Sequence, residues 1–77
     1  LGVAAADLPP SDPFARGCWL VRHDQADAAI PSFAEAEKTD PSGRPAEWLA
    51  YCHARTGNHQ TAREAGDRAV DAGRHTA

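Results

Sequence analysis

The side chains with which this chain could bind a metal ion are its two cysteines and four histidines. Structural zinc sites take such ligands from short motifs with characteristic spacing. Here the candidate spacings are Cys18-x4-His23 and the adjacent pair Cys52-His53, and neither matches a common zinc motif. Adjacent residues on a helix also point about 100° apart, so Cys52 and His53 would not share one ion. We therefore expect no metal site.

Covalent catalysis would require a cysteine or serine beside a base, with a third group that orients the base. Cys18 and His23 lie five residues apart, which is a poor spacing for one helix face. Four acidic residues follow the pattern of a solvated helix surface: Asp24, Asp27, Glu35 and Glu37. The glycines are isolated and form no phosphate-binding loop. We predict a non-catalytic chain that uses no cofactor.

The elements that position these residues are set by proline, glycine and helix-capping residues. Asp12-Pro13 is a favourable helix start, Asp24 and Asn58 are candidate caps, and Asp40-Pro41 ends a helix. No segment shows sustained strand-like alternation. The predicted helices cover residues 13–23, 25–39, 45–56 and 59–73.

Two segments lie outside these helices. Residues 1–11 are apolar or proline-rich without a period, so we expect an extended arm or linker; a secretory signal tail with small residues at 4–6 is the alternative. Residues 74–77 are expected to form a C-terminal tail. Pro31 falls inside the second helix, so either that helix is kinked or it starts later.

A shift of 33 residues superposes the second pair of helices on the first. Small residues recur where two helices must approach closely, and one arginine recurs with them. The matched pairs are Arg22 with Arg55, Ala29 with Ala62, Ala36 with Ala69, and Gly17 with Ala50.

This spacing resembles the tetratricopeptide repeat, a helix–turn–helix unit of about 34 residues. The first unit carries Gly17-x2-Leu20, Ala29-x3-Phe33 and Pro41 at the family positions. The second unit is degenerate, since Gly66 stands where the aromatic residue is usual. The resemblance covers residues 12–73 and implies an all-α fold of two antiparallel hairpins, an α-solenoid fragment of four helices. An unrelated four-helix arrangement is the alternative.

In this family the first helix of each unit lines a concave groove that receives a peptide. Carried over to this chain, the groove residues are Phe14, Cys18, Val21, Arg22, Glu47, Tyr51 and Arg55. Arg22 and Arg55 would together hold a carboxylate, so the expected partner is a protein or peptide, and an acidic one fits the arginines. The alternative is that both arginines pair with neighbouring acidic residues. The family's chaperone-tail clamp is not matched.

Packing arguments place Trp19 and Trp48 mainly in the core, each opposite a small residue on the neighbouring helix: Trp19 opposite Cys52, and Trp48 opposite Ala15. The fourth helix has only a thin stripe of alanines with Val70. More polypeptide, a second copy of the chain or the arm of residues 1–11 could cover this stripe. Self-association, or structural assembly that completes a larger helical repeat protein, is therefore the alternative function. A bridge between Cys18 and Cys52 is a further possibility.

Composition sets the outer limits. The net charge of -3 argues against a nucleic-acid or anionic-membrane binder, which would normally carry a basic face. No apolar run approaches the roughly 20 residues of a membrane span. Two cysteines and no complete signal favour a cytoplasmic location.

Overall fold

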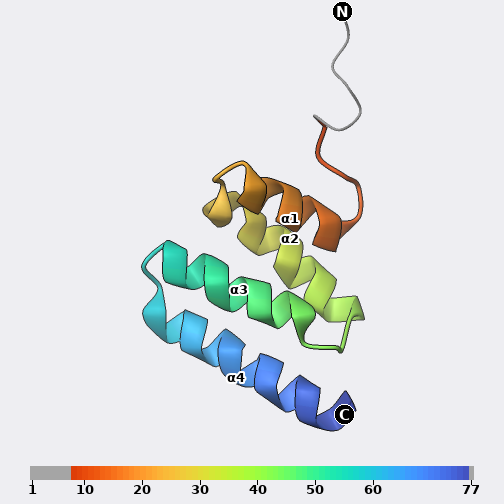
Figure 1. Cartoon of the computed structure of the whole chain (residues 1–77), viewed down its shortest axis with the longest axis vertical. Helices are drawn as coiled ribbons and strands as arrows, with labels where there is room; N and C mark the ends of the chain where they lie inside the picture. Colours follow the sequence, from red (N-terminus) through yellow and green to blue (C-terminus); the bar gives the residue numbers. More distant parts are fainter. Residues whose placement is uncertain (1–7, 77) are drawn as a thin grey trace, which may run out of the picture.

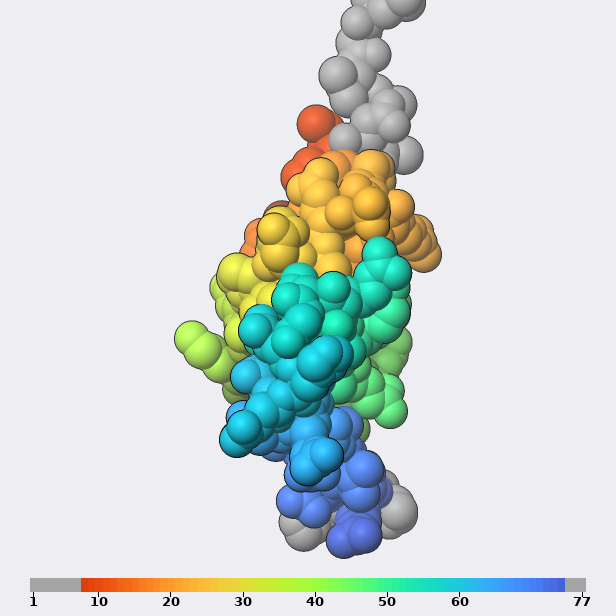
Figure 2. Space-filling view, turned by 90° about the vertical axis from the view of Figure 1, so that its left-hand side faces the viewer, coloured from red at the N-terminus to blue at the C-terminus, as the bar shows by residue number. Residues whose placement is uncertain are grey.

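The computed structural model describes residues 8–76, which form four helices and no strand. They are α1 (Pro13–Arg22), α2 (Ala26–Thr39), α3 (Arg44–Arg55) and α4 (His59–Thr76). Each helix packs mainly against the next one in the chain. The α1–α2 and α3–α4 turns lie on the same side of the molecule, so the two hairpins stack in the same sense (Figures 1 and 2). The predicted all-α fold of two hairpins is confirmed.

The start of α1 follows the sequence closely. Asp12 is the N-cap, and its Oδ2 accepts a hydrogen bond from the Ala15 backbone N–H at 2.9 Å, while Pro13 opens the first turn. Residues 8–12 are not helical, and Leu8 is 57% exposed. The rest of the predicted arm, residues 1–7, lies outside the described residues.

The turn between α1 and α2 corrects one prediction, because Asp24 does not cap α2. The N-cap is Gln25, which makes no side-chain capping bond. The Asp24 and Gln25 N–H groups instead donate back to the carbonyls of Val21 and Leu20, at 3.0 and 2.9 Å. This tight reversal gives Asp24 a φ of 60°, a left-handed conformation that aspartate tolerates better than most residues. The Asp24 carboxylate instead accepts a hydrogen bond from Arg55 of α3.

Helix α2 runs without a break through Pro31. The alternative of a later start is therefore wrong. Pro31 is exposed, so its ring occupies the solvent side of the helix. The helix ends at Thr39, as the Asp40-Pro41 dipeptide predicts.

Gly43 fixes how the second hairpin closes. It caps α3 with a φ of 90°, which an L side chain rarely adopts. A Cβ at this position would also lie 3.0 Å from the Ala69 carbonyl oxygen and from Ala72 Cβ on α4. The loop is held at its start by Asp40, whose Oδ1 accepts the Ser42 N–H at 3.0 Å, a bond that lowers the pKa of Asp40.

Helix α4 differs from its predicted end. It continues through Gly73 to Thr76, so residues 74–76 extend the helix rather than forming a tail. Glycine at this position permits a helix to end but does not require it.

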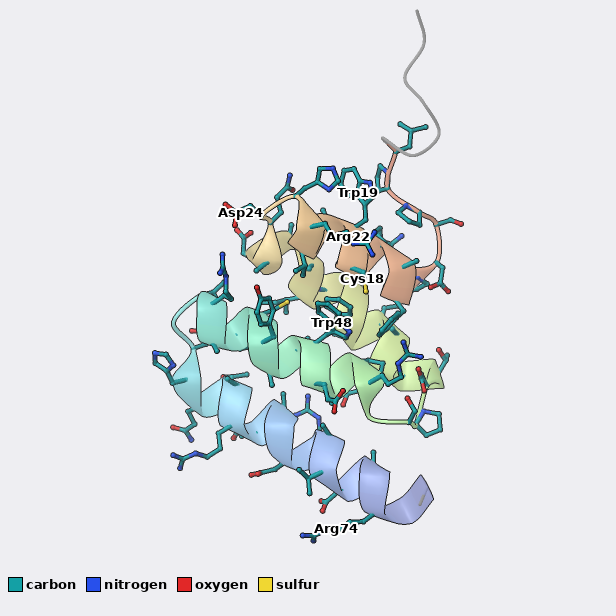
Figure 3. The ribbon with its side chains drawn as sticks, viewed as in Figure 1. Cys18, Trp19, Arg22, Asp24, Trp48 and Arg74 are labelled. Carbon is teal, nitrogen blue, oxygen red and sulfur yellow. The ribbon has the colours of Figure 1, made fainter. Side chains whose placement is uncertain are left out.

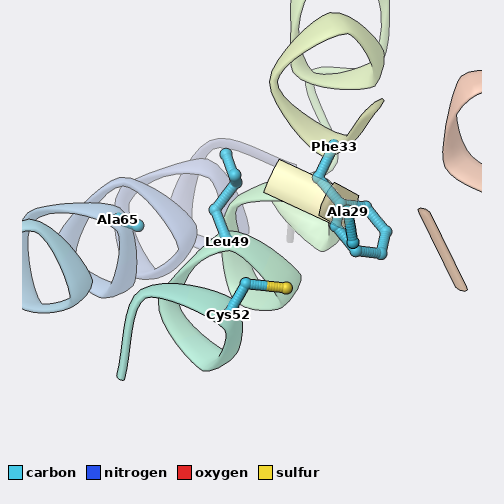
Figure 4. Close-up of a cluster of buried hydrophobic side chains, with 5 residues drawn as sticks. All are labelled: Ala29, Phe33, Leu49, Cys52 and Ala65. Atoms are coloured by element: carbon cyan, nitrogen blue, oxygen red, sulfur yellow. The ribbon is translucent and has the colours of Figure 1, made fainter. Parts of the chain in front are cut away.

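The core is a small cluster centred between α2 and α3 (Figure 4). It contains Ala29, Phe33, Leu49, Cys52 and Ala65. Phe33 is fully buried, with its ring edge-on to Phe14 at 5.6 Å and stacked on Trp48 at 5.4 Å. Gly17 presses its backbone against the same ring. A Cβ on Gly17 would lie 2.7 Å from Phe33 ring atoms, which explains why this helix position carries glycine.

The contacts within the first hairpin differ in chemistry from those within the second. In the first, Arg16 Nε donates to Ser32 Oγ at 3.0 Å, and the guanidinium pairs with Glu35 at 3.2 Å. The positions one repeat later carry Leu49 and Ala65, both buried. The second hairpin therefore has an apolar contact where the first has a polar one.

An ion pair also links the two hairpins. Arg68 of α4 holds Glu37 of α2 through two hydrogen bonds, at 2.8 and 3.2 Å. Bidentate pairs of this kind fix geometry as well as charge. The two hairpins are therefore joined by an ion pair in addition to the apolar core.

Candidate functional site

The α1–α3 surface is the face on which α1 and α3 lie alongside each other. It contains a hollow of about 540 Å³ lined by Val21 of α1 and by Glu47, Trp48 and Tyr51 of α3. Three of these four residues were predicted to line a groove, and Trp48 was not. In Figure 3, Cys18 and Trp48 both lie between the two helices.

Trp48 joins the hollow to the core. One side of its ring stacks on the buried Phe33 with an interplanar angle of 11°, and Tyr51 packs against it edge-on at 6.1 Å. Trp48 is thus partly buried and packed against the core, as predicted, although against Phe33 rather than Ala15. Tyr51 remains 44% exposed. An aromatic anchored in this way presents a rigid apolar contact.

Phe14 and Cys18 of α1 do not line the hollow. Both are partly buried against the core cluster, so they support the surface and are only partly accessible from it. Burial raises the pKa of the Cys18 thiol, while the positive charges of Arg22 and Arg44 act in the opposite direction.

Cys52 is fully buried, and burial together with the charge of Cys18 raises the pKa of its thiol. Both cysteines are free. Neither thiol has the lowered pKa that activates a nucleophilic cysteine.

Three arginines border the α1–α3 surface: Arg22, Arg44 and Arg55. The two predicted ones, Arg22 and Arg55, differ in their contacts. Arg55 stacks over Tyr51 with its guanidinium carbon 5.8 Å from the ring centroid, and it pairs with Asp24 at 3.1 Å. Arg22 is exposed and makes no ion pair with any described residue. The alternative of neighbouring acidic partners thus holds for Arg55 and does not hold for Arg22.

Arg44 is a further cation near this surface, and the predicted groove residues do not include it. It begins α3, and its guanidinium carbon lies 5.0 Å from the Phe14 ring centroid. The signal available in the sequence was its position four residues before Trp48, on the same helix face. The sequence predicts that this helix starts at Pro45, whereas α3 begins one residue earlier, at Arg44.

Trp19 corrects a further prediction. It is partly buried but does not pack against the described core cluster; its ring stacks on His23 at 3.9 Å with an interplanar angle of 23°. It lies on the side of α1 away from α3 (Figure 3). The predicted pairing of Trp19 with Cys52 is therefore wrong, since Cys52 packs in the core with Ala29 and Phe33.

His53 matches its predicted place on the inward side of α3. It is partly buried, and its Nδ1 is buried without a hydrogen-bond partner in the described structure. A further hollow lies on α4 and is lined by polar residues: His59, Gln60, Arg63 and Glu64.

Two further searches cover residues 8–76. In this range no group of three or more His, Cys, Asp or Glu side chains is placed to hold a metal ion. None of the helices in the same range is both long enough and apolar enough to cross a membrane.

Comparison with known families agrees with the geometry. The sequence model of the tetratricopeptide repeat family matches residues 14–75, so the chain belongs to this family. Domains of this family are generally protein–protein interaction modules and are typically non-catalytic. No curated protein and no solved structure matches the chain.

Proposed function

We propose that this chain is a non-catalytic module that binds a protein or peptide segment on the α1–α3 surface. The observation that carries the proposal is the hollow of about 540 Å³ lined by Val21, Glu47, Trp48 and Tyr51. It lies on the first helices of the two units, where the family pattern predicts the groove. Its centre is aromatic and partly exposed, as in surfaces where a few aromatic residues dominate binding.

The packing beneath the hollow supports this role. Trp48 is stacked on a fully buried ring, so the surface is rigid before a partner arrives. A preformed site loses less conformational entropy on binding than a flexible one. Residues Phe14, Cys18, Arg22 and Arg55 extend the proposed site around the hollow.

The test uses the whole chain and peptides selected from a random phage library. Peptides that bind are measured by fluorescence polarisation against Tyr51→Ala and against Val70→Ala as the control. Val70 is a matched control because it is an apolar side chain of similar exposure, 55%, on the opposite edge of the molecule. We expect Tyr51→Ala to weaken binding by about thirtyfold, the effect of a central aromatic residue. Unchanged binding in Tyr51→Ala, or equal loss in both variants, rejects the site.

Self-association is a second candidate, and α4 supplies the observation that favours it. Val70 is exposed, and a Cβ on the neighbouring Gly66 would meet no atom within 4 Å, so this face of α4 is open in the described structure. Sedimentation across a concentration series tests it. A chain that stays monomeric, or a dimer that Val70→Glu does not dissociate, removes this candidate.

A further inference from the structure

We infer that Cys18 and Cys52 form a reversible disulfide between α1 and α3 when the chain meets a small-molecule disulfide such as oxidised glutathione. The bond joins the two hairpins covalently, so the stability of the chain depends on the redox conditions around it. This reaction is independent of the proposed function, because it concerns the two thiols and requires no protein partner.

The two thiols belong to one layer of the helix packing. Phe14 of α1 and Trp48 of α3 both pack on the Phe33 ring of α2, with ring centroids 5.6 and 5.4 Å apart. Helices α1 and α3 run in the same direction and α2 runs in the opposite one (Figure 1). One helical turn further along the same three faces, the residues are Cys18, Cys52 and Ala29.

The observed burial agrees with this layer. Cys52 and Ala29 are fully buried in one core cluster, and Cys18 is partly buried against the same cluster. The Cys52 sulfur points away from α3, toward the side on which the Phe33 ring lies (Figure 4), and Cys18 lies between α1 and α3 (Figure 3). A charge on Cys18 also acts on the Cys52 thiol, so the two groups are within electrostatic range of each other. Because α2 contributes only an alanine to this layer, no large side chain of α2 stands between the two cysteines.

The two thiols differ in how a reagent can reach them. Cys18 is partly exposed, whereas Cys52 is fully buried, so a dissolved disulfide meets Cys18 first. Burial raises the pKa of both thiols, although the charges of Arg22 and Arg44 favour the Cys18 thiolate. Both cysteines are therefore mainly protonated at neutral pH and react slowly, which keeps the pair reduced where thiols are in excess.

The reaction consists of two thiol–disulfide exchanges. The Cys18 thiolate attacks one sulfur of oxidised glutathione, which forms a mixed disulfide and releases one glutathione thiolate; this thiolate takes up the proton that Cys18 lost. Cys52 then loses its proton and attacks the Cys18 sulfur, so the Cys18–Cys52 bond forms and the mixed disulfide breaks. The second glutathione leaves and takes up that proton. Two protein thiols are oxidised, and one glutathione disulfide is reduced to two thiols.

The bond closes a loop that contains all of α2 and most of α3. A cross-link of this kind restricts the unfolded chain and so stabilises the folded one, more for longer loops. A disulfide requires Cα atoms about 4.4–6.8 Å apart, so it also holds α1 close to α3. In the reduced chain the two hairpins are joined by one short loop and by non-covalent contacts.

The experiment uses the whole chain, first reduced and then freed of reductant, in buffers with increasing ratios of oxidised to reduced glutathione. Acid stops the exchange, the remaining thiols are alkylated, and mass spectrometry measures the intact chain and its proteolytic fragments. We expect a monomer that has lost two hydrogens, carries no alkylated cysteine and yields fragments linked through Cys18 and Cys52. Disulfide-linked dimers, glutathione on both cysteines, or a chain that stays reduced at every ratio overturns the inference.

The same series in urea shows whether the fold promotes the bond. We expect the effective concentration of the two thiols to be at least about tenfold higher in the native chain than in the unfolded chain. By linkage, the oxidised chain should then have a Tm at least about 5 °C above that of the reduced chain. Equal effective concentrations, or a lower Tm after oxidation, would show that the fold does not place the two sulfurs together.

Two variants test the order of the steps. Cys52→Ala should stop at the mixed disulfide on Cys18, whereas Cys18→Ala should stay unmodified over the same time, because oxidised glutathione does not reach Cys52. Glutathione added equally fast to both variants overturns the inference. Circular dichroism checks that each variant keeps its helicity, and where one does not, the measurements on the unmutated chain decide.

Discussion

Replacing Gly17 with alanine tests the contact on which the stacking of the first hairpin depends. The added Cβ would lie 2.7 Å from two atoms of the Phe33 ring and 2.9 Å from a third. Carbon atoms in contact are normally about 3.5–4.0 Å apart, so the ring would have to move by about 1 Å. Phe33 is fully buried between Phe14 and Trp48 and has no free space to move into.

The expected change is the difference between two opposing effects. Forcing an extra methyl group into a packed core costs about 1–3 kcal/mol. Alanine in place of glycine inside a helix stabilises by up to about 1 kcal/mol. Three ring atoms within 3 Å place the steric cost at the upper part of its range, so we expect Gly17→Ala to lower the free energy of unfolding by about 1–2 kcal/mol.

Gly66→Ala is the matched control. Gly66 is also a helical glycine, but a Cβ there would meet no atom within 4 Å. Only the helix propensity remains, so this variant should be more stable by about 0.5–1 kcal/mol. The same substitution therefore changes stability in opposite directions at the two positions.

Urea unfolding followed by circular dichroism measures both variants, with thermal unfolding as the second readout. For a domain of this size, 1 kcal/mol corresponds to a shift in Tm of about 4–8 °C. Gly17→Ala combined with Phe33→Leu should recover part of the loss, because the smaller side chain makes room for the methyl group. If Gly17→Ala stabilises the chain as much as Gly66→Ala does, Phe33 does not lie against the α1 backbone and the packing described above is wrong.

Three further predictions concern other parts of the molecule. Gly43→Ala should destabilise by about 1–3 kcal/mol, because it combines a positive φ with a contact at Ala69; urea unfolding would show this, and an unchanged midpoint would refute it. Burial raises the pKa of Cys52, so the folded state holds this proton more tightly than the unfolded state. The resulting stability is present at neutral pH and is lost as the pH rises above about 9. Cys52→Ala should be less stable than the unmodified chain at pH 7, but its free energy of unfolding should fall less between pH 8 and 10. Unfolding curves at these pH values measure this, and equal losses in both proteins would contradict it. Asp24→Asn should change the free energy of unfolding by less than about 0.5 kcal/mol in urea unfolding, because its pair with Arg55 is exposed. A larger loss would show that this pair contributes to the packing of the two hairpins.

The sequence predicted helix ends correctly where interactions within a few residues determine them and no contact from elsewhere in the chain opposes them. Asp12-Pro13 starts α1 and Asp40-Pro41 ends α2, because capping and the proline ring act within a few residues. The same kind of rule failed at Gly73, where glycine permits a helix to end but does not require it.

The candidate site shows a similar division. The family resemblance implied that Val21, Glu47 and Tyr51 line a groove, and all three line the hollow. Spacing could not show that Trp48 is shared between the core and this hollow, because its place depends on how deep Phe33 lies. The pairing of Arg55 was equally hidden, since its partner Asp24 is distant in the chain and faces α3 only through the left-handed turn.

By itself, the sequence determined four helices, their pairing into two hairpins and the repeat that relates them, because these follow from the spacing of proline, glycine and small residues. The tertiary structure alone decided which large side chains became core, since Phe33 took the space beside Gly17 while Trp19 stayed at the edge of α1. It also decided that Arg55 pairs with Asp24. Both outcomes depend on distances between residues far apart in the chain, which local sequence patterns do not contain.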